Sequence, residues 1–371
     1  MTPEAPASGR SLRSTITSDG EVRLSLKEVE LPELGEGQVL IAVEASPINP
    51  SDLGVLLGPM DPAGLVRDGE DLVGSMPTQI LPVFRDRLDK PLPVGNEGAG
   101  TVVAGVPEMV GKRVATFGGS MWADYRVADA GAVVPLPDDV STAEGAALFI
   151  NPLTALSMVE TMRAENHTAL VHTAAASNLG QMLVKICAAD GVPLVNIVRK
   201  PEQVELLESI GAEHVVDSSQ PDFAEQLTEA IRTTGATLAF DAIGGGTLAS
   251  DILNAMERAQ PPLESWTPYG TTVLKQVYVY GALDFGPTVV ERRFGLTWAI
   301  GGYLLTVALG KLGGEAFMRM RSRVIAEAKT TFASSFAETI GLAGILDPEN
   351  LAVFSQRSTG AKYLVDPSSD R

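Results

Sequence analysis

Residues 169–185 read ALVHTAAASNLGQMLVK, and this stretch decides the fold. It opens with an apolar run typical of a buried strand, passes through small residues, and continues at 177–191 with the helical spacing of SNLGQMLVKICAADG. Apolar strand-like runs and amphipathic helical windows go on alternating to about residue 285. Because such alternation builds a parallel sheet with helices on both faces, residues 168 to about 285 predict a doubly wound α/β domain.

The flanking sequence predicts a second, β-rich domain. Residues 21–45 and the runs up to about 135 alternate in polarity and are broken by Pro and Gly, which is typical of strands and turns. The final AKYLVDP at 361–367 looks like a strand that cannot be stable alone, so we expect it to return to the first domain. The predicted domains are 1–152 with 306–371, and 153–305; residues 60–92 are predicted to be a long surface excursion.

Composition limits the possible partners. The net charge is −18, with no clustered Lys and Arg, which argues against nucleic acid and anionic membranes as partners. The single cysteine, Cys187, excludes a disulfide framework within the chain, and we expect a cytoplasmic protein. The apolar run at 294–310 falls just short of a membrane span, so we interpret it as buried core or a subunit interface.

The turn after the first predicted strand is the candidate cofactor site. In a dinucleotide fold, a G-x-G-x-x-G turn lets the backbone approach the pyrophosphate at a helix N-terminus. Here the three glycine positions are Ala175, Ser177 and Gly180, with Asn178 and Leu179 between the last two. The replacements are small, and Ser177 could donate to a phosphate oxygen. The alternative is a small-residue helix start in another α/β fold.

The end of the next predicted strand indicates the type of cofactor. An NAD site requires a carboxylate there for the ribose 2′-hydroxyl, whereas an NADP site requires a cation for the 2′-phosphate. This strand ends in NIVRKPEQ, which offers Arg199 and Lys200 and no acid. Since a guanidinium can bind phosphate through two donors, NADPH is the predicted cofactor. The alternative is that the two cations are a solvated surface pair.

Ten segments, in order, resemble the medium-chain dehydrogenase/reductase superfamily in its zinc-independent branch of quinone oxidoreductases and enoyl thioester reductases. They are SPINPSD (46–52), GNEGAGTVV (95–103), WADYRV (122–127), INPLTA (150–155), HTAAASNLG (172–180), NIVRKPEQ (196–203), LLESIGAEHVV (206–216), FDAIGGG (240–246), GGYLL (301–305) and GAKYLVDP (360–367). The resemblance implies a Rossmann domain inserted in a β-rich, GroES-like catalytic domain.

The resemblance also implies roles for individual residues. Asn49 matches the polar residue at the catalytic cleft between the domains, and Tyr303 matches an aromatic that shapes the substrate pocket. The residues implied to contact the cofactor, besides those of the Ala175–Gly180 turn, are Thr154 beside the nicotinamide, Ile243 and Gly244 at its ribose, Gly281 and Ala282 beside the carboxamide, and Lys362 from the tail.

Three positions depart from the relatives. Enoyl thioester reductases of this branch place a proton-donating tyrosine where Met60 stands, so Met60 is a predicted substrate-pocket residue, and quinone reductases often have a tyrosine where Gly54 stands. In zinc enzymes of the superfamily a histidine ligand occupies the position of Asn96. With no cysteine in SPINPSD either, we expect no zinc. His172 is expected to be packed, and His167 and His214 to be surface residues.

These observations predict an NADPH-dependent reductase of quinones or α,β-unsaturated carbonyl compounds, since such acceptors spread the incoming charge onto a carbonyl oxygen without zinc. The alternatives are a protein that binds NADPH without turnover and an alcohol dehydrogenase-like enzyme. We also expect a homodimer, paired through the strand-like QVYVYGALD (276–284) with the 294–310 run close to the interface.

Overall fold

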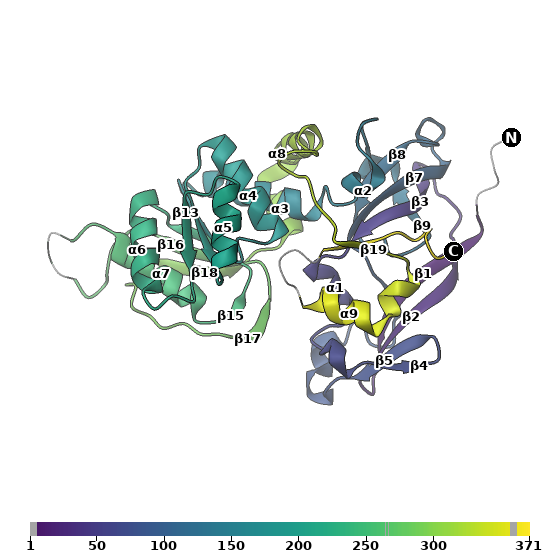
Figure 1. The fold of residues 1–371 in the computed structure, drawn as a ribbon, viewed down its shortest axis with the longest axis horizontal. Coiled ribbons are helices and arrows are strands. Elements are labelled where there is room, and N and C mark those ends of the chain that lie inside the picture. The colour runs from purple at the N-terminus through teal and green to yellow at the C-terminus, as the bar shows by residue number, and fades with distance from the viewer. Residues whose placement is uncertain (1–5, 264, 266, 357–361) are drawn as a thin grey trace. The chain divides into compact units, whose positions relative to one another are not determined.

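The structure is a computed structural model that describes residues 6–263, 265, 267–356 and 362–371. The chain divides into two compact units (Figure 1). The first comprises Met1–Ile150 and Glu327–Arg371, and the second is Asn151–Ala326. The second boundary lies later than the predicted residue 305, because the helical segment Leu305–Ala326, which is kinked at Gly313, stays with the second unit.

Two sheets form the first unit, as the alternating sequence predicts. One has the strand order β4-β5-β2-β1-β6, and the other has the order β10-β8-β7-β3-β20-β19 with β9 also paired to β3. The strands are β1 (Ser8–Ile16), β2 (Glu21–Glu30), β3 (Gln38–Pro47), β4 (Val66–Asp68), β5 (Asp71–Ser75), β6 (Leu92–Pro93), β7 (Glu97–Gly105), β8 (Arg113–Phe117), β9 (Tyr125–Asp129), β10 (Val134–Pro135), β19 (Glu338–Ile340) and β20 (Tyr363–Val365). Its α-helices are α1 (Pro50–Leu56), α2 (Thr142–Gly145) and α9 (Pro348–Ser355).

The predicted return of the C-terminal strand is confirmed. Strand β20 pairs antiparallel with β3, opposite Ser46 and Pro47, and parallel with β19. This pairing brings Lys362, the residue before β20, beside the segment that carries Asn49. Lys362 and the segment before α1, which are far apart in the sequence, therefore lie side by side within the first unit.

The prediction that residues 60–92 form a surface excursion is wrong. Strands β4 and β5 from this segment extend the first sheet by pairing with β2, and Leu72, Met76 and Leu81 are buried in the core of the unit. The Pro, Gly and Asp residues that suggested a loop supply its turns and two 3-10 helices, Pro62–Gly64 and Thr78–Phe84. The free energy gained by burying these few apolar side chains keeps the segment in the fold although its average composition is polar.

The second unit is a doubly wound α/β domain, as predicted. Its parallel sheet has the order β13-β12-β11-β14-β16-β18, in which the direction of winding reverses between β11 and β14. The strands are β11 (Leu170–His172), β12 (Leu194–Val198), β13 (His214–Asp217), β14 (Leu238–Asp241), β16 (Lys275–Val279) and β18 (Trp298–Gly302), with a separate pair β15 (Gly244–Gly246) and β17 (Asp284–Thr288). The helices are α3 (Ile150–Ala164), α4 (Asn178–Asp190), α5 (Pro201–Ser209), α6 (Phe223–Thr234), α7 (Leu248–Ala259) and α8 (Leu305–Ala326).

Helices cover both faces of this sheet. Figure 1 shows α6 and α7 on one side of its strands and α4 and α5 on the other. The α6–α7 face closes over an apolar cluster that includes Val171, Ile197, Leu227 and Ile252. Ligands of such sheets bind outside the carboxyl ends of the strands, at the point where the strand order reverses. From the topology, a ligand is therefore expected at the carboxyl ends of β11 and β14.

Strand β16 is internal, so the prediction that 276–284 pairs across a two-fold axis is wrong. It lies between β14 and β18, and β18, from the apolar 294–310 run, is at the end of the sheet. The run is not buried core throughout, because Leu296, Leu304 and Val307 are 63%, 63% and 53% exposed, and the alternative of a subunit interface stays a prediction. Among the described helices, none is long and apolar enough to cross a membrane.

Candidate active site

The turn after β11 brings the predicted cofactor residues together. Ser177 is the N-cap of α4, and its Oγ accepts the Gly180 N–H at 3.2 Å. A Cβ on Gly180 would lie 2.1 Å from the carbonyl oxygen of Ala175, so only glycine fits there. Ala174 has φ of 50°, the left-handed conformation that non-glycine residues seldom adopt outside functional or strained turns. The turn is thus built for close backbone approach although two glycines are replaced.

The end of β12 places two cations next to this turn in the sheet order. Arg199 and Lys200 directly follow the strand, and both are exposed. Lys200 is the N-cap of α5 and lies 4.0 Å from Glu202, while the backbone N–H of Arg199 donates to Gln203 at 3.1 Å. The nearby Asp217 ends β13, where its carboxylate accepts from Ser219 and Gln220.

A buried carboxylate fixes the loop after β14. Asp241 is 1% exposed and accepts from the Thr173 hydroxyl at 2.7 Å and from the N–H groups of Ile243 and Gly244 at 2.9 and 3.1 Å. Gly244 has φ of 83°, which glycine adopts without strain. This arrangement holds the predicted residues Ile243 and Gly244 at the strand-order reversal.

The neighbouring loop after β16 also comes close to this point. A Cβ on Gly281 would lie 2.5 Å from the carbonyl oxygen of Ala242, so glycine is required between the two strand ends. Ala282 follows in the same loop. Sequence reasoning did not identify the supporting residues Thr173 and Asp241, although Asp241 lies inside the FDAIGGG segment.

Two predicted residues of the second unit are joined through α3. The Tyr303 hydroxyl donates to Ser157 Oγ at 2.9 Å, and Ser157 in turn donates to the carbonyl oxygen of Thr154 at 2.9 Å. Tyr303 Oη also lies 3.0 Å from Thr161 Oγ1, and burial raises the pKa of Tyr303. These bonds hold Tyr303 against the helix that carries Thr154.

In the first unit, Glu97 organises a buried polar cluster around Asn49. The Glu97 side chain is fully buried, and its Oε1 accepts from Asn49 Nδ2 at 2.8 Å. Its Oε2 accepts the N–H groups of Phe149 and Ile150 at 2.9 and 2.8 Å. Burial raises the pKa of Glu97, while the positive charge of Lys362 and these three donors lower it. Donors that satisfy both oxygens favour the carboxylate form.

Asp52 is the second buried carboxylate of this cluster. Its Oδ2 accepts the backbone N–H of Asn49 at 2.8 Å, and its Oδ1 accepts that of Asn96 at 2.7 Å. Burial raises the pKa of Asp52 to about 7, with the nearby charge of Glu97 also raising it, while the two N–H groups and Lys362 lower it. Asp52 therefore ties the segment before α1 to the segment before β7.

Lys362 supplies the positive charge of the cluster. Its ammonium group is buried, lies 5.5 Å from the ring centroid of Phe336, and has no hydrogen-bond partner among the residues that the structure describes. Burial lowers the pKa of Lys362, and the charges of Glu97 and Asp52 raise it. The predicted tail residue thus lies close to Asn49, held by charge rather than by a direct hydrogen bond.

Comparison with known proteins supports the fold assignment given above. Residues 179–259 match the family described as zinc-binding dehydrogenase. The mitochondrial enoyl-[acyl-carrier-protein] reductase of Caenorhabditis elegans is 28% identical over 247 residues, which cover 63% of this chain and 64% of that protein. The chain thus spans less than two thirds of the length of this curated relative.

Two solved structures match over almost the whole chain. A putative NADPH:quinone reductase from Mesorhizobium loti is 28% identical with a TM-score of 0.73, covering 98% of this chain and 100% of that one. A putative NADPH:quinone reductase from Bacillus thuringiensis, at 20% identity, has a TM-score of 0.73 and covers 97% and 99%, which shows the shared fold. These matches support the resemblance of the chain to the medium-chain dehydrogenase/reductase superfamily.

The residues at the two positions where the resemblance leads one to expect a tyrosine have different environments. Met60 is half-buried and packs on the core of the first unit, where a Cβ on Gly74 of β5 would lie 2.8 Å from its sulfur. Gly54 lies in α1, and a Cβ added to it would meet no atom within 4 Å. A substrate contact of Met60 stays a prediction.

The buried histidines have structural partners. His172 is packed, as predicted; burial lowers its pKa to about 3, and its Nε2 lies 2.8 Å from the Tyr280 hydroxyl. The prediction that His167 lies on the surface is wrong, because it is 8% exposed with Nδ1 2.7 Å from Thr237 Oγ1. His214 is half-buried at the start of β13.

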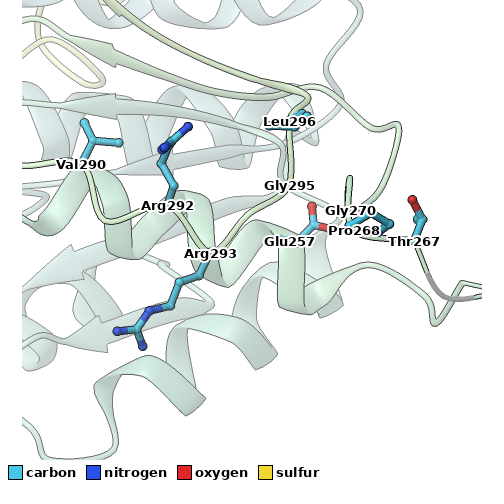
Figure 2. Close-up of a pocket in the computed structure, with 9 residues that line it drawn as sticks. All are labelled: Glu257, Thr267, Pro268, Gly270, Val290, Arg292, Arg293, Gly295 and Leu296. Atoms are coloured by element: carbon cyan, nitrogen blue, oxygen red, sulfur yellow. The ribbon is translucent and has the colours of Figure 1, made fainter.

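A cavity of about 730 Å³ in the second unit lies away from these residues. Figure 2 shows its lining, in which Arg292 and Arg293 point in different directions. Its carboxylate, Glu257, is already bound by Lys275 Nζ at 2.6 Å and by Thr271. The cavity lies near the start of β16 and β18, at the amino ends of the strands, whereas ligands of such sheets bind outside the carboxyl ends. We therefore take the turn after β11, and not this cavity, as the candidate cofactor site.

Replacement of Glu97 tests whether it organises the first unit. The variant Glu97→Gln presents an amide NH₂ to backbone N–H donors and removes the countercharge of Lys362, so we expect a loss of roughly 3 kcal/mol in the free energy of unfolding. Urea denaturation measures it. The matched control is Glu108→Gln, an exposed carboxylate of the same unit, which should change stability by less than about 0.5 kcal/mol. Equal effects of the two variants would contradict the assignment.

Proposed function

We propose that the protein is an NADPH-dependent, zinc-independent oxidoreductase that reduces quinones or the activated C=C bonds of α,β-unsaturated carbonyl compounds. The observation that carries the proposal is the Ala175–Gly180 turn at the carboxyl end of β11, followed by Arg199 at the end of β12. The relatives described as NADPH:quinone reductases and enoyl reductases support it. When bound, NADPH supplies the hydride.

The residues present fit this cofactor. The close contact of Gly180 with Ala175, the cap by Ser177 and the Ile243–Gly244 loop bound by Asp241 match the compact turn with which a dinucleotide fold approaches the pyrophosphate. Arg199 and Lys200 offer cations for a 2′-phosphate where an NAD site would hold a carboxylate. Thr154 and the Gly281–Ala282 loop are proposed to orient the nicotinamide, with Lys362 as a further contact.

Substrate contacts are proposed from the first unit. Asn49 is held by Glu97 and Asp52, so its position is fixed before substrate arrives, and it would orient the carbonyl group of the acceptor. The zinc-independent part of the proposal rests on the residues at the expected ligand positions. Asn96, at the expected histidine position, binds Ser51 and Asp52, and residues 46–52 contain no cysteine.

An acceptor panel tests the reductase proposal. NADPH absorbance should fall when ortho-quinones, aryl enones or trans-2-enoyl thioesters are added, and primary alcohols with NADP⁺ should give no reaction. A parallel titration of NADPH fluorescence measures binding. Binding without oxidation by any acceptor would overturn the reductase activity and leave a protein that binds NADPH without turnover. Activity that depends on added zinc would overturn the zinc-independent part.

A second experiment tests the choice of cofactor. Because a charge-assisted contact with the 2′-phosphate contributes roughly 1.5–3 kcal/mol, Arg199→Ala should weaken NADPH binding roughly 10- to 100-fold and leave NADH binding almost unchanged. Fluorescence titration with both nucleotides measures the ratio. Arg232→Ala, on α6 of the same unit, is the matched control. Equal losses for both nucleotides would show that Arg199 does not contact the 2′-phosphate.

We also propose a homodimer, with the interface moved from the predicted β16 to β18. Among the described strands, β18 pairs with β16 alone, and exposed apolar side chains flank it at Leu296 and Leu304. An apolar edge of this kind is a template for pairing with a second copy. Sedimentation should give twice the chain mass, and Leu304→Glu should reduce it to the monomer mass. Val83→Glu, at a residue 79% exposed in the first unit, should not.

A further inference from the structure

His172, the last residue of β11, is a buried polar side chain outside the proposed cofactor contacts. It is fully buried, and burial lowers its pKa to about 3, so the imidazole is neutral. Its Nε2 lies 2.8 Å from the Tyr280 hydroxyl, whereas its Nδ1 has no hydrogen-bond partner among the residues that the structure describes. A buried polar atom without a partner costs stability that an apolar side chain would not lose, and such residues are retained chiefly where a function needs them.

The bond between His172 and Tyr280 joins strand ends that are not neighbours in the sheet. Tyr280 directly follows β16, and β14 lies between β16 and β11. The ring centroids of the pair are 5.7 Å apart and the ring planes differ by 16°. Since a tyrosine hydroxyl can donate or accept, the pair makes its bond in either tautomer of the imidazole. The adjacent Thr173 binds Asp241 at the end of β14, so two successive residues brace two different strand ends.

Tyr280 fixes the start of the loop that contains Gly281 and Ala282. Its backbone N–H donates to the carbonyl oxygen of the last residue of β14 at 2.9 Å, while the imidazole holds its hydroxyl. At the other end of the loop, the Leu283 N–H donates to a carbonyl oxygen of the loop after β14 at 3.2 Å. Gly281 and Ala282, the residues proposed to orient the nicotinamide, therefore lie between two anchors, and the side-chain bond of the first anchor comes from His172.

We infer that the His172–Tyr280 pair positions the Gly281–Ala282 loop for the nicotinamide of NADPH. The inference rests on the proposed function and adds two positioning residues to it, which act through the loop. A loop that is held at both ends before binding loses less entropy when the cofactor is ordered. The 2′-phosphate end of the cofactor, proposed to lie at Arg199, does not depend on this loop. Loss of the pair therefore weakens the nicotinamide contacts selectively.

Two ligands that share the adenosine end test this role by calorimetric titration. Adenosine 2′,5′-bisphosphate carries the 2′-phosphate but no nicotinamide, so His172→Phe should weaken NADPH roughly tenfold and change the affinity for the bisphosphate by less than about twofold. Tyr280→Phe, which removes one hydroxyl, should do the same, and the double variant should lose little more than either single variant. His172→Gln should retain most of the NADPH affinity, because a glutamine amide can take the place of the imidazole Nε2.

His167→Phe is the matched control, because His167 is also buried and bound to one hydroxyl, that of Thr237, but precedes β11 at the amino end of the sheet. It should change neither affinity by more than about twofold. Equal weakening of both ligands by His172→Phe would mean a structural role and would overturn the inference, as would unchanged NADPH affinity in both single variants. The titration needs no acceptor, so it is independent of turnover. Failure of the unaltered protein to bind NADPH would instead overturn the proposed cofactor, and the inference with it.

Discussion

The polar cluster around Asn49 depends on the buried carboxylate of Glu97. A charged group in the core is stable only when its oxygens are satisfied, and Glu97 achieves this with Asn49 Nδ2 and the N–H groups of Phe149 and Ile150. The same bonds connect β7, the segment before α1 and the start of α3. Movement of any of these segments would leave a buried polar group unpaired. The need to satisfy the buried carboxylate therefore also fixes the positions of the segments.

The second unit meets a similar requirement with Asp241. Its carboxylate binds Thr173 at the end of β11 and the loop after β14, so the strand-order reversal is held by one buried acid. In both units a carboxylate supports polar groups and is itself inaccessible to a ligand. The groups proposed to contact cofactor or substrate are therefore arranged before binding, which reduces the entropy lost when a ligand is ordered.

Much of this fold was predictable because its signals are local. The period of apolar residues from 168 to about 285 predicts parallel strands and helices, and the isolated AKYLVDP predicts a returning strand. The order of strands in a sheet is not a local property, so the sequence could not show that β18 lies outside β16. The polar composition of residues 60–92 likewise gave no sign of β4 and β5, because a few buried residues such as Leu72 determine whether such a segment is buried.

Residues of the candidate site were predictable where the backbone geometry requires one residue type, as at Gly180 and Gly244. They were not predictable where the function of a side chain depends on a residue far away in the sequence. Asn96 illustrates the second case. From sequence it is the absence of a metal ligand, whereas in the fold its amide supports Ser51 and its N–H satisfies Asp52. A histidine at this position could still donate its backbone N–H to Asp52, but it has no amide Nδ2 to donate to Ser51. The replacement thus exchanges a metal ligand for a residue that holds two neighbouring segments together.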